Sequence, residues 1–128
     1  MMEITFPGSV QVNARFNGFE ITTDQPEKNG GQNSAPSPFD FFLASLGTCA
    51  GFFALRFCQQ RGLSTDGLRL QLTTKHNAET KRLDRVEITM QLPKDFPEKY
   101  RSAIIRATDQ CAVKKALLDT PEIEIITL

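Results

Sequence analysis

The sequence lacks several features that mark common classes of protein. It has no tryptophan, one histidine and three cysteines, and fifteen basic residues balance fifteen acidic ones to give zero net charge. No cluster of lysine and arginine predicts a nucleic-acid surface. The cysteines and His76 show none of the short spacings of a zinc site, and no glycine-rich phosphate loop is present. We therefore expect no metal, no other cofactor and no nucleic-acid partner.

The N-terminal segment MMEITFPGSVQV has neither the basic residues nor the long apolar run of a secretory signal. An odd number of cysteines without such a signal favours a reducing compartment, in which thiols stay free. We therefore expect a cytoplasmic protein. A length of 128 residues suits one hydrophobic core, so residues 1–128 are expected to form a single domain.

Hydrophobic periodicity predicts an α+β fold. Strand-like segments flank Asn17-Gly18, a pair typical of a tight β-hairpin because both turn positions need positive φ. Residues 24–36 are rich in Gly, Pro, Asn and Asp and are expected to form a loop. The whole pattern predicts the order β-β-β-α-β-β-α-α-β. Its later elements are strands near residues 68–73 and 86–92, helices near 98–108 and 110–118, and a last strand at 122–128.

One long helix dominates the prediction. Ser37 suits the N-cap, Pro38 the first helical position and Asp40 a capping box, and Gly62 suits the position after the helix end. Six of the ten phenylalanines fall between these limits, and they do not lie on one stripe. Because Asp40 and Arg56 interrupt the apolar run, we expect a core helix and no membrane span. Such a helix needs burial on most of its surface, which predicts that a second subunit covers it.

The cysteines allow two interpretations from the residues alone. Free cysteines are usually buried and act as small hydrophobes, which suits Cys49 and Cys58 inside the long helix. Cys58 is nine residues after Cys49, on the opposite face, so the two cannot pair. Cys111 begins a short helix, where unpaired backbone N–H groups would lower its pKa if Asp109 were the N-cap. The alternative is a redox centre made of Cys49 and Cys111.

The segments PSPFDFFLASLGTCAG and CAVKKAL, some sixty residues apart, resemble the OsmC/Ohr family of osmotically inducible and organic-hydroperoxide-resistance proteins. The chain looks most like the general OsmC-like branch. The resemblance implies an intertwined homodimer with two central helices and thiol-dependent reduction of organic hydroperoxides. It implies that Cys49 attacks the peroxide, that Cys111 resolves the sulfenic acid to a disulfide, and that a dithiol, such as a lipoylated protein, restores both thiols.

The sequence departs from the family pattern around the first cysteine. Phe19 stands where the family has an arginine, with Arg15 nearby but before the turn, and Phe39 stands at the position of the catalytic acid, one residue before Asp40. Ala112 replaces the proline that follows the second cysteine. These departures imply weak or altered peroxidase activity. The alternative hypothesis is a dimeric binding protein for a small apolar ligand, in which the cysteines are idle.

Overall fold

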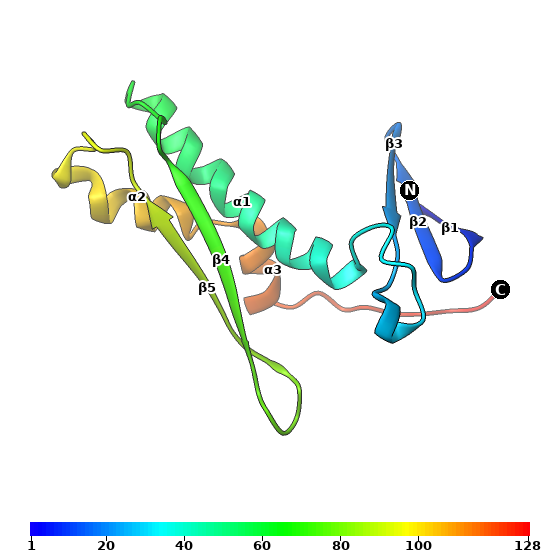
Figure 1. The fold of residues 1–128 in the computed structure, drawn as a ribbon. Coiled ribbons are helices and arrows are strands. Elements are labelled where there is room, and N and C mark those ends of the chain that lie inside the picture. The colour runs from blue at the N-terminus through cyan, green and yellow to red at the C-terminus, as the bar shows by residue number, and fades with distance from the viewer. The chain divides into compact units, whose positions relative to one another are not determined.

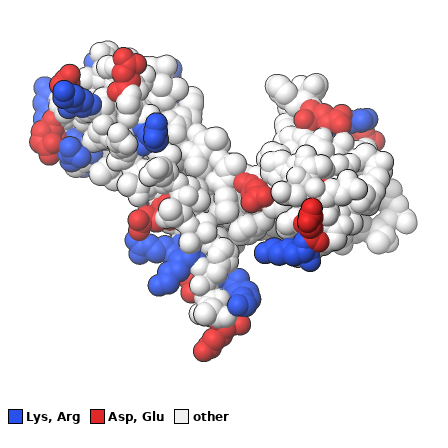
Figure 2. Space-filling model, in the orientation of Figure 1, with Lys and Arg blue, Asp and Glu red and all other residues white.

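The computed structural model describes all 128 residues and has a mixed α+β architecture with two antiparallel sheets and three α-helices (Figure 1). The chain separates into two compact units, Met1–Ala44 and Ser45–Leu128. The mixed α+β class predicted from the sequence is confirmed. Figure 2 shows acidic and basic side chains interspersed on the visible face of the molecule.

The N-terminal unit is built on a three-stranded sheet with the strand order β1-β2-β3. Its strands are β1 (Glu3–Gly8), β2 (Gln11–Phe16) and β3 (Phe19–Thr23). Asn17 and Gly18 join β2 to β3 with φ values of 50° and 79°, and Phe16 pairs with Phe19 across the turn. The predicted hairpin is therefore confirmed, and its turn uses the left-handed conformations that Asn-Gly tolerates.

The loop after β3 is fastened by one buried carboxylate. Asp24 is 1% exposed and accepts hydrogen bonds from the backbone N–H groups of Gln25, Gln32 and Ser34, at 2.8, 3.2 and 3.0 Å. The Ser34 hydroxyl donates a fourth bond at 2.6 Å. These bonds, led by that from the Ser34 side chain, lower the pKa of Asp24 to about 2. The loop closes around the carboxylate, with one turn of 3-10 helix, η1 (Glu27–Asn29), within it.

The long helix α1 (Pro38–Gln60) begins and ends as its sequence predicts. Asp40 accepts hydrogen bonds from the N–H and hydroxyl of Ser37, both at 2.9 Å, and its own N–H donates to the Ser37 hydroxyl at 3.2 Å. This is the expected capping box. At the other end Gly62 adopts a φ of 62°, and the N–H of Leu63 donates to the Cys58 carbonyl at 2.9 Å. That bond closes a Schellman motif, which ends the helix at Gln60.

The C-terminal unit packs a hairpin and short helices against α1 (Figure 1). Strands β4 (Arg69–His76) and β5 (Leu83–Gln91) pair antiparallel, and α2 (Arg101–Thr108) follows a 3-10 turn, η2 (Glu98–Tyr100). The core consists of Ala54, Phe57 and Cys58 from α1 and Ile104 from α2, with partly buried residues of β4 and β5 around them. The last helix is α3 (Ala112–Leu118).

The strand expected at residues 122–128 is absent. The alternation that suggested it is real, but no segment of the same chain pairs with these residues, and a strand needs a neighbour for its backbone hydrogen bonds. Its apolar side chains stand in solvent, with Ile123 83%, Ile125 93% and Ile126 71% exposed. The prediction is wrong for the isolated chain, because it assumed a pairing partner that this chain does not contain.

The helix α1 keeps a large exposed apolar surface in the single chain. Phe39, Phe52 and Leu55 are 48%, 53% and 38% exposed, whereas its buried residues lie on the side that faces α2 and the hairpin. By length and mean hydropathy (1.6 over its most apolar window) α1 could also cross a membrane, a property shared by core helices of soluble proteins. The burial that its phenylalanines require is therefore only partly met within one chain.

Replacing Asp24 by Asn should loosen residues 25–34, because an amide cannot accept all the hydrogen bonds that the carboxylate accepts. The pKa of Asp24 is lowered from 3.8 to about 2, so its stabilising effect should be complete above pH 4 or so and be lost as the pH falls toward 2. Amide hydrogen exchange of the loop measures both effects. Glu27→Gln, which changes an exposed carboxylate of the same loop, is the control. Equal exchange in both variants would contradict this account.

Candidate functional site

The fold brings Cys49 and Cys111 together. Cys49 lies near the middle of α1 and is half-buried, while Cys111 directly precedes α3 and is 3% exposed. Each side chain shifts the pKa of the other, so the two lie close together, and neither cysteine forms a disulfide. Sixty-one residues lie between them in the sequence, so the pair depends on β4, β5 and α2 to return the chain to α1.

Cys111 is held in its protonated form. Its sulfur caps α3 by accepting the N–H of Lys114 at 3.4 Å, and its thiol lies 3.9 Å from the carbonyl oxygen of Leu46. Burial raises the pKa of Cys111, and the contact with Cys49 raises it further, against the lowering effect of the Lys114 N–H. The thiol of Cys111 can therefore donate its proton either to the Leu46 carbonyl or to the sulfur of Cys49.

Cys49 has the opposite character. The backbone N–H of Val113 hydrogen-bonds to its sulfur and is the largest cause that lowers the pKa of Cys49. Hydrogen bonds from the Cys111 side chain and the Ala112 N–H act in the same direction, while burial opposes them. A lowered pKa increases the fraction of thiolate, which is the nucleophilic form. Cys49 is therefore the better nucleophile of the pair.

This arrangement reverses the expectation that Cys111 is the activated thiol. Asp109 does not cap α3; it caps the end of α2 and forms an ion pair with Lys114, which leaves Cys111 itself as the N-cap. The free N–H groups at the start of α3 point at the sulfur of Cys49 as well as that of Cys111. Sequence reasoning missed the roles of the Ala112 and Val113 backbone. The signal was the segment Cys-Ala-Val-Lys, in which a capping cysteine leaves three N–H groups without helical partners.

Arg15 and Asp40, the polar residues near the two positions that depart from the family pattern, interact with groups other than Cys49. Arg15 forms an ion pair with Glu20 at 2.9 Å within the β2–β3 hairpin, where Phe19 is 68% exposed. Asp40 caps α1 through Ser37, and Phe39 is 48% exposed. The groups that shift the pKa of Cys49 include no cation. Backbone N–H groups are thus the principal support of a thiolate at Cys49.

Cys58 is a core residue and not part of the pair. It is fully buried beside Ala54, Phe57 and Ile104, on a different face of α1 from Cys49. Burial raises the pKa of its thiol, against a smaller opposite effect of Arg61. A buried neutral thiol of this kind acts as a small hydrophobic side chain.

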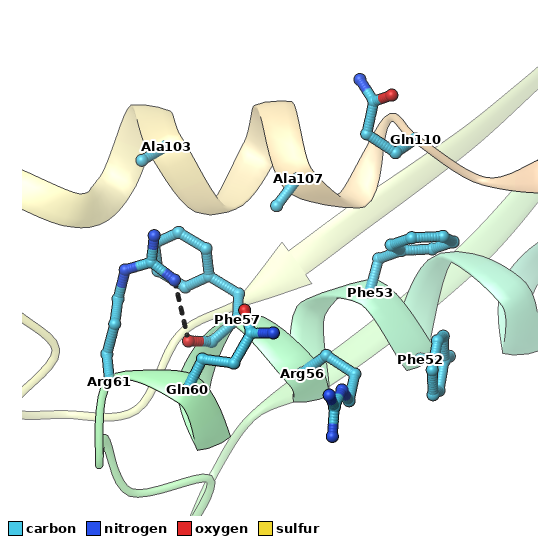
Figure 3. A pocket seen from close by; sticks show the side chains of 9 residues that line it. All are labelled: Phe52, Phe53, Arg56, Phe57, Gln60, Arg61, Ala103, Ala107 and Gln110. Carbon is cyan, nitrogen blue, oxygen red and sulfur yellow. Dashed lines mark hydrogen bonds between the residues drawn. The ribbon is translucent and has the colours of Figure 1, made fainter.

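A groove of about 390 Å³ lies between α1 and α2 (Figure 3). Phe53, Phe57, Ala103 and Ala107 form its apolar walls, and polar side chains stand at its rim. The volume falls within the range of small-molecule sites, and apolar walls with a few polar groups are typical of them. No group of His, Cys, Asp and Glu in the structure is arranged to hold a metal ion.

Replacing Ala112 by Pro should raise the pKa of Cys49, because proline removes one of the N–H groups that hydrogen-bond to its sulfur. The helix should persist, since proline is favoured at the first helical position. The pH dependence of alkylation by iodoacetamide, with the modified cysteine identified by mass spectrometry, measures the change. Alkylation of Cys49 should be slower than in the wild type near pH 7 and equal to it at high pH. An unchanged or lower pKa would contradict the assignment.

The comparisons with known proteins agree with this architecture. A sequence model of the family described as OsmC-like protein matches residues 31–126. No match is found among curated proteins. The most similar solved structures include an osmotic stress induced and detoxification response protein from Psychrobacter arcticus (TM-score 0.76, 23% identity, covering 90% of this chain and 85% of the other).

Two further structures share the fold. One is an OsmC-like protein from Mycoplasma pneumoniae (TM-score 0.73, 14% identity, covering 94% and 87%). The other is an organic hydroperoxide resistance protein from Legionella pneumophila (TM-score 0.63, 13% identity, covering 91% and 87%). At these identities the structures establish the likeness of fold alone, whereas the family model spans most of the sequence, including both cysteines. The chain therefore belongs to the OsmC-like protein family.

Proposed function

We propose that this protein reduces organic hydroperoxides with Cys49 as the attacking thiol and Cys111 as the resolving thiol. The observation that carries the proposal is the contact between the two side chains, in which Cys49 has a lowered pKa and Cys111 a raised one. This division suits a nucleophile and a proton-holding partner. A related fold from Legionella pneumophila bears the name of an organic hydroperoxide resistance protein, which is consistent with the same chemistry.

In the first step, the Cys49 thiolate attacks one oxygen of the peroxide and the O–O bond breaks. The leaving alkoxide takes up a proton and departs as an alcohol, which leaves a sulfenic acid on Cys49. The proton of Cys111 is available nearby, since its thiol contacts the Cys49 sulfur. The sulfur of Cys111 then attacks the sulfenic sulfur, the hydroxyl group takes up a proton from solvent and leaves as water, and a Cys49–Cys111 disulfide forms. An external dithiol, such as a lipoylated protein, reduces the disulfide by exchange and is itself oxidised.

The site stabilises its thiolate through the backbone. The N–H groups of Val113 and Ala112 are fixed by α3 and carry no net charge, so they favour a thiolate less strongly than an adjacent guanidinium would. We therefore propose a slower peroxidase than one with an arginine beside the thiol. The apolar groove between α1 and α2 suits a hydroperoxide with a bulky apolar group better than hydrogen peroxide.

We further propose that the active protein is a cytoplasmic homodimer. Three free thiols are compatible with a reducing compartment. The exposed apolar residues of α1 and the unpaired segment 122–128 both need a partner to bury or pair them. A second copy supplies both, because its sheet edge can accept the alternating residues of the tail as an added strand.

A binding protein for a small apolar ligand is the second candidate. It is favoured by the absence of a cation among the groups that act on Cys49 and by the open groove between α1 and α2. In that case Cys49 and Cys111 would fill space without reacting.

Treatment of the reduced protein with one equivalent of cumene hydroperoxide should oxidise Cys49 within minutes. Mass spectrometry should find a Cys49–Cys111 disulfide in the wild type and a Cys49 sulfenic acid in Cys111→Ser, because that variant cannot resolve the intermediate. Cys49→Ser should consume no peroxide above the background rate, and Cys58→Ser should behave as the wild type. If Cys49 stays reduced in the wild type, the peroxidase proposal is wrong and the binding protein is favoured.

Replacing Ile125 by Pro should weaken the dimer. Proline removes a backbone N–H that the tail would use to pair with a second copy, and it removes an isoleucine side chain that is 93% exposed in the single chain. Light scattering at micromolar concentration should give a dimer for the wild type and a larger monomer fraction for the variant. Thr127→Ser, which keeps the backbone N–H of the same tail, is the control. A monomeric wild-type protein would exclude the dimer.

A further inference from the structure

The connection between α2 and α3, residues 109–111, carries Cys111. The backbone N–H groups of Asp109 and Gln110 donate to carbonyl oxygens of α2 at 3.0 and 3.1 Å. The helix α2 is itself held in the core by Ile104, which is fully buried. Asp109 and Gln110 therefore continue the fixed end of α2, and Cys111 follows them directly.

The helix α3 has little burial of its own. It is seven residues long and contains no buried residue, and its Leu117 and Leu118 are 48% and 77% exposed. Around its first turn, Cys111 is 3% exposed and Val113 is half-buried. A helix of this length is not stable in isolation. Contacts close to the connection therefore have to set its direction relative to α2.

Two side-chain bridges span this connection. Lys114 forms an ion pair with Asp109, and the ammonium of Lys115 donates to the side-chain oxygen of Gln110 at 2.8 Å. Each bridge joins a residue fixed on α2 to a residue of α3. Figure 3 shows the amide of Gln110 directed away from α1, so it does not reach into the groove below it. The two bridges together restrain the angle between α2 and α3.

The charges of the ion pair are placed against both helix dipoles. Asp109 stands at the C-cap of α2, and Lys114 lies in the first turn of α3. An anion at a C-terminus and a cation at an N-terminus are each unfavourable for their own helix. The groups that shift the pKa values of the two paired thiols include the backbone of Lys114 and not its ammonium. A link across the connection accounts for this ion pair, whereas helix stability and direct charge on the thiols do not.

We infer that Asp109 and Gln110 are positioning residues, whose bridges to α3 hold the two paired sulfur atoms in contact. Neither residue touches the reacting atoms. They act through α3, whose first turn carries the N–H groups that reach Cys49 and is capped by Cys111. Restraint of this kind raises the effective concentration of one reacting group at the other. A role in resolving the sulfenic acid rests on the proposed function, whereas the restraint on the sulfur atoms does not.

The test replaces the peroxide by the neutral disulfide dithiodipyridine, added in one equivalent to Cys58→Ser so that only the paired thiols react. The Cys49 thiolate attacks one sulfur of the reagent, its S–S bond breaks, and one thiopyridone leaves. Cys111 then loses its proton to solvent, and its sulfur displaces the second thiopyridone, which leaves a Cys49–Cys111 disulfide. Stopped-flow absorbance separates the two releases, because the rate of the second does not depend on the reagent concentration.

The second release should slow when the bridges are removed. Its limiting rate constant at high pH, where Cys111 is ionised, reports the positions of the sulfur atoms and not their pKa values. This constant should fall about threefold in Asp109→Ala and about tenfold in the double variant Asp109→Ala with Gln110→Ala. Asp109→Glu, which keeps the carboxylate, should stay close to the unmodified pair. The limiting rate constant of the first release should be the same in all variants.

Glu98→Gln is the matched control, because it breaks an exposed ion pair with Arg101 at the other end of α2. It should change neither release, and a general loss of stability would affect both releases alike. An unchanged second release in the double variant, or an equal slowing in Glu98→Gln, would overturn the inference.

The outcome is separable from the proposed function. If cumene hydroperoxide leaves Cys49 reduced but the second release slows as expected, the peroxidase proposal fails and the positioning role stands. If the hydroperoxide oxidises Cys49 and the second release does not respond to the double variant, the peroxidase proposal stands and the positioning role is wrong.

Discussion

The hydrogen bonds from the backbone of Ala112 and Val113 to the sulfur of Cys49 are the interaction on which the site depends. Cys49 lies in the middle of α1, where the helix has no unpaired N–H groups of its own to offer. The N–H groups therefore come from the first turn of a second helix, which faces Cys49. The chain from β4 to α2 places α3 in that position. Cys111 caps the same helix. The short segment at the start of α3 therefore lowers the pKa of Cys49 and also carries Cys111, whose thiol stays protonated.

The second constraint is the apolar character of α1. One side of the helix packs in the core through Ala54, Phe57 and Cys58, and another forms a wall of the groove between α1 and α2. A third, with Phe39, Phe52 and Leu55, remains exposed in the single chain. The same helix thus carries Cys49, forms one wall of the apolar groove and presents the surface that we assign to a second copy. Its phenylalanine content follows from these three demands together.

Much of the fold could be predicted from local chemistry. The turn at Asn17-Gly18, the capping box of Ser37 and Asp40 and the helix end at Gly62 are each set by residues close in sequence. The site was harder, because the acidity of Cys49 depends on N–H groups that are distant in the chain and have no side-chain signature. The strand expected at residues 122–128 is absent because an alternating pattern specifies which face is buried and not which strand pairs with it, and no segment of this chain pairs with these residues.

The central claim is that Cys49 is the more acidic of the two paired thiols although no cation lies beside it. The most direct measurement is a pH titration of the cysteine ¹³Cβ chemical shifts by NMR in the reduced protein. We expect Cys49 to titrate first, below the ordinary range of a thiol, with Cys111 and Cys58 titrating above it. If Cys111 titrates before Cys49, or if Cys49 titrates no lower than an ordinary thiol, the account is contradicted.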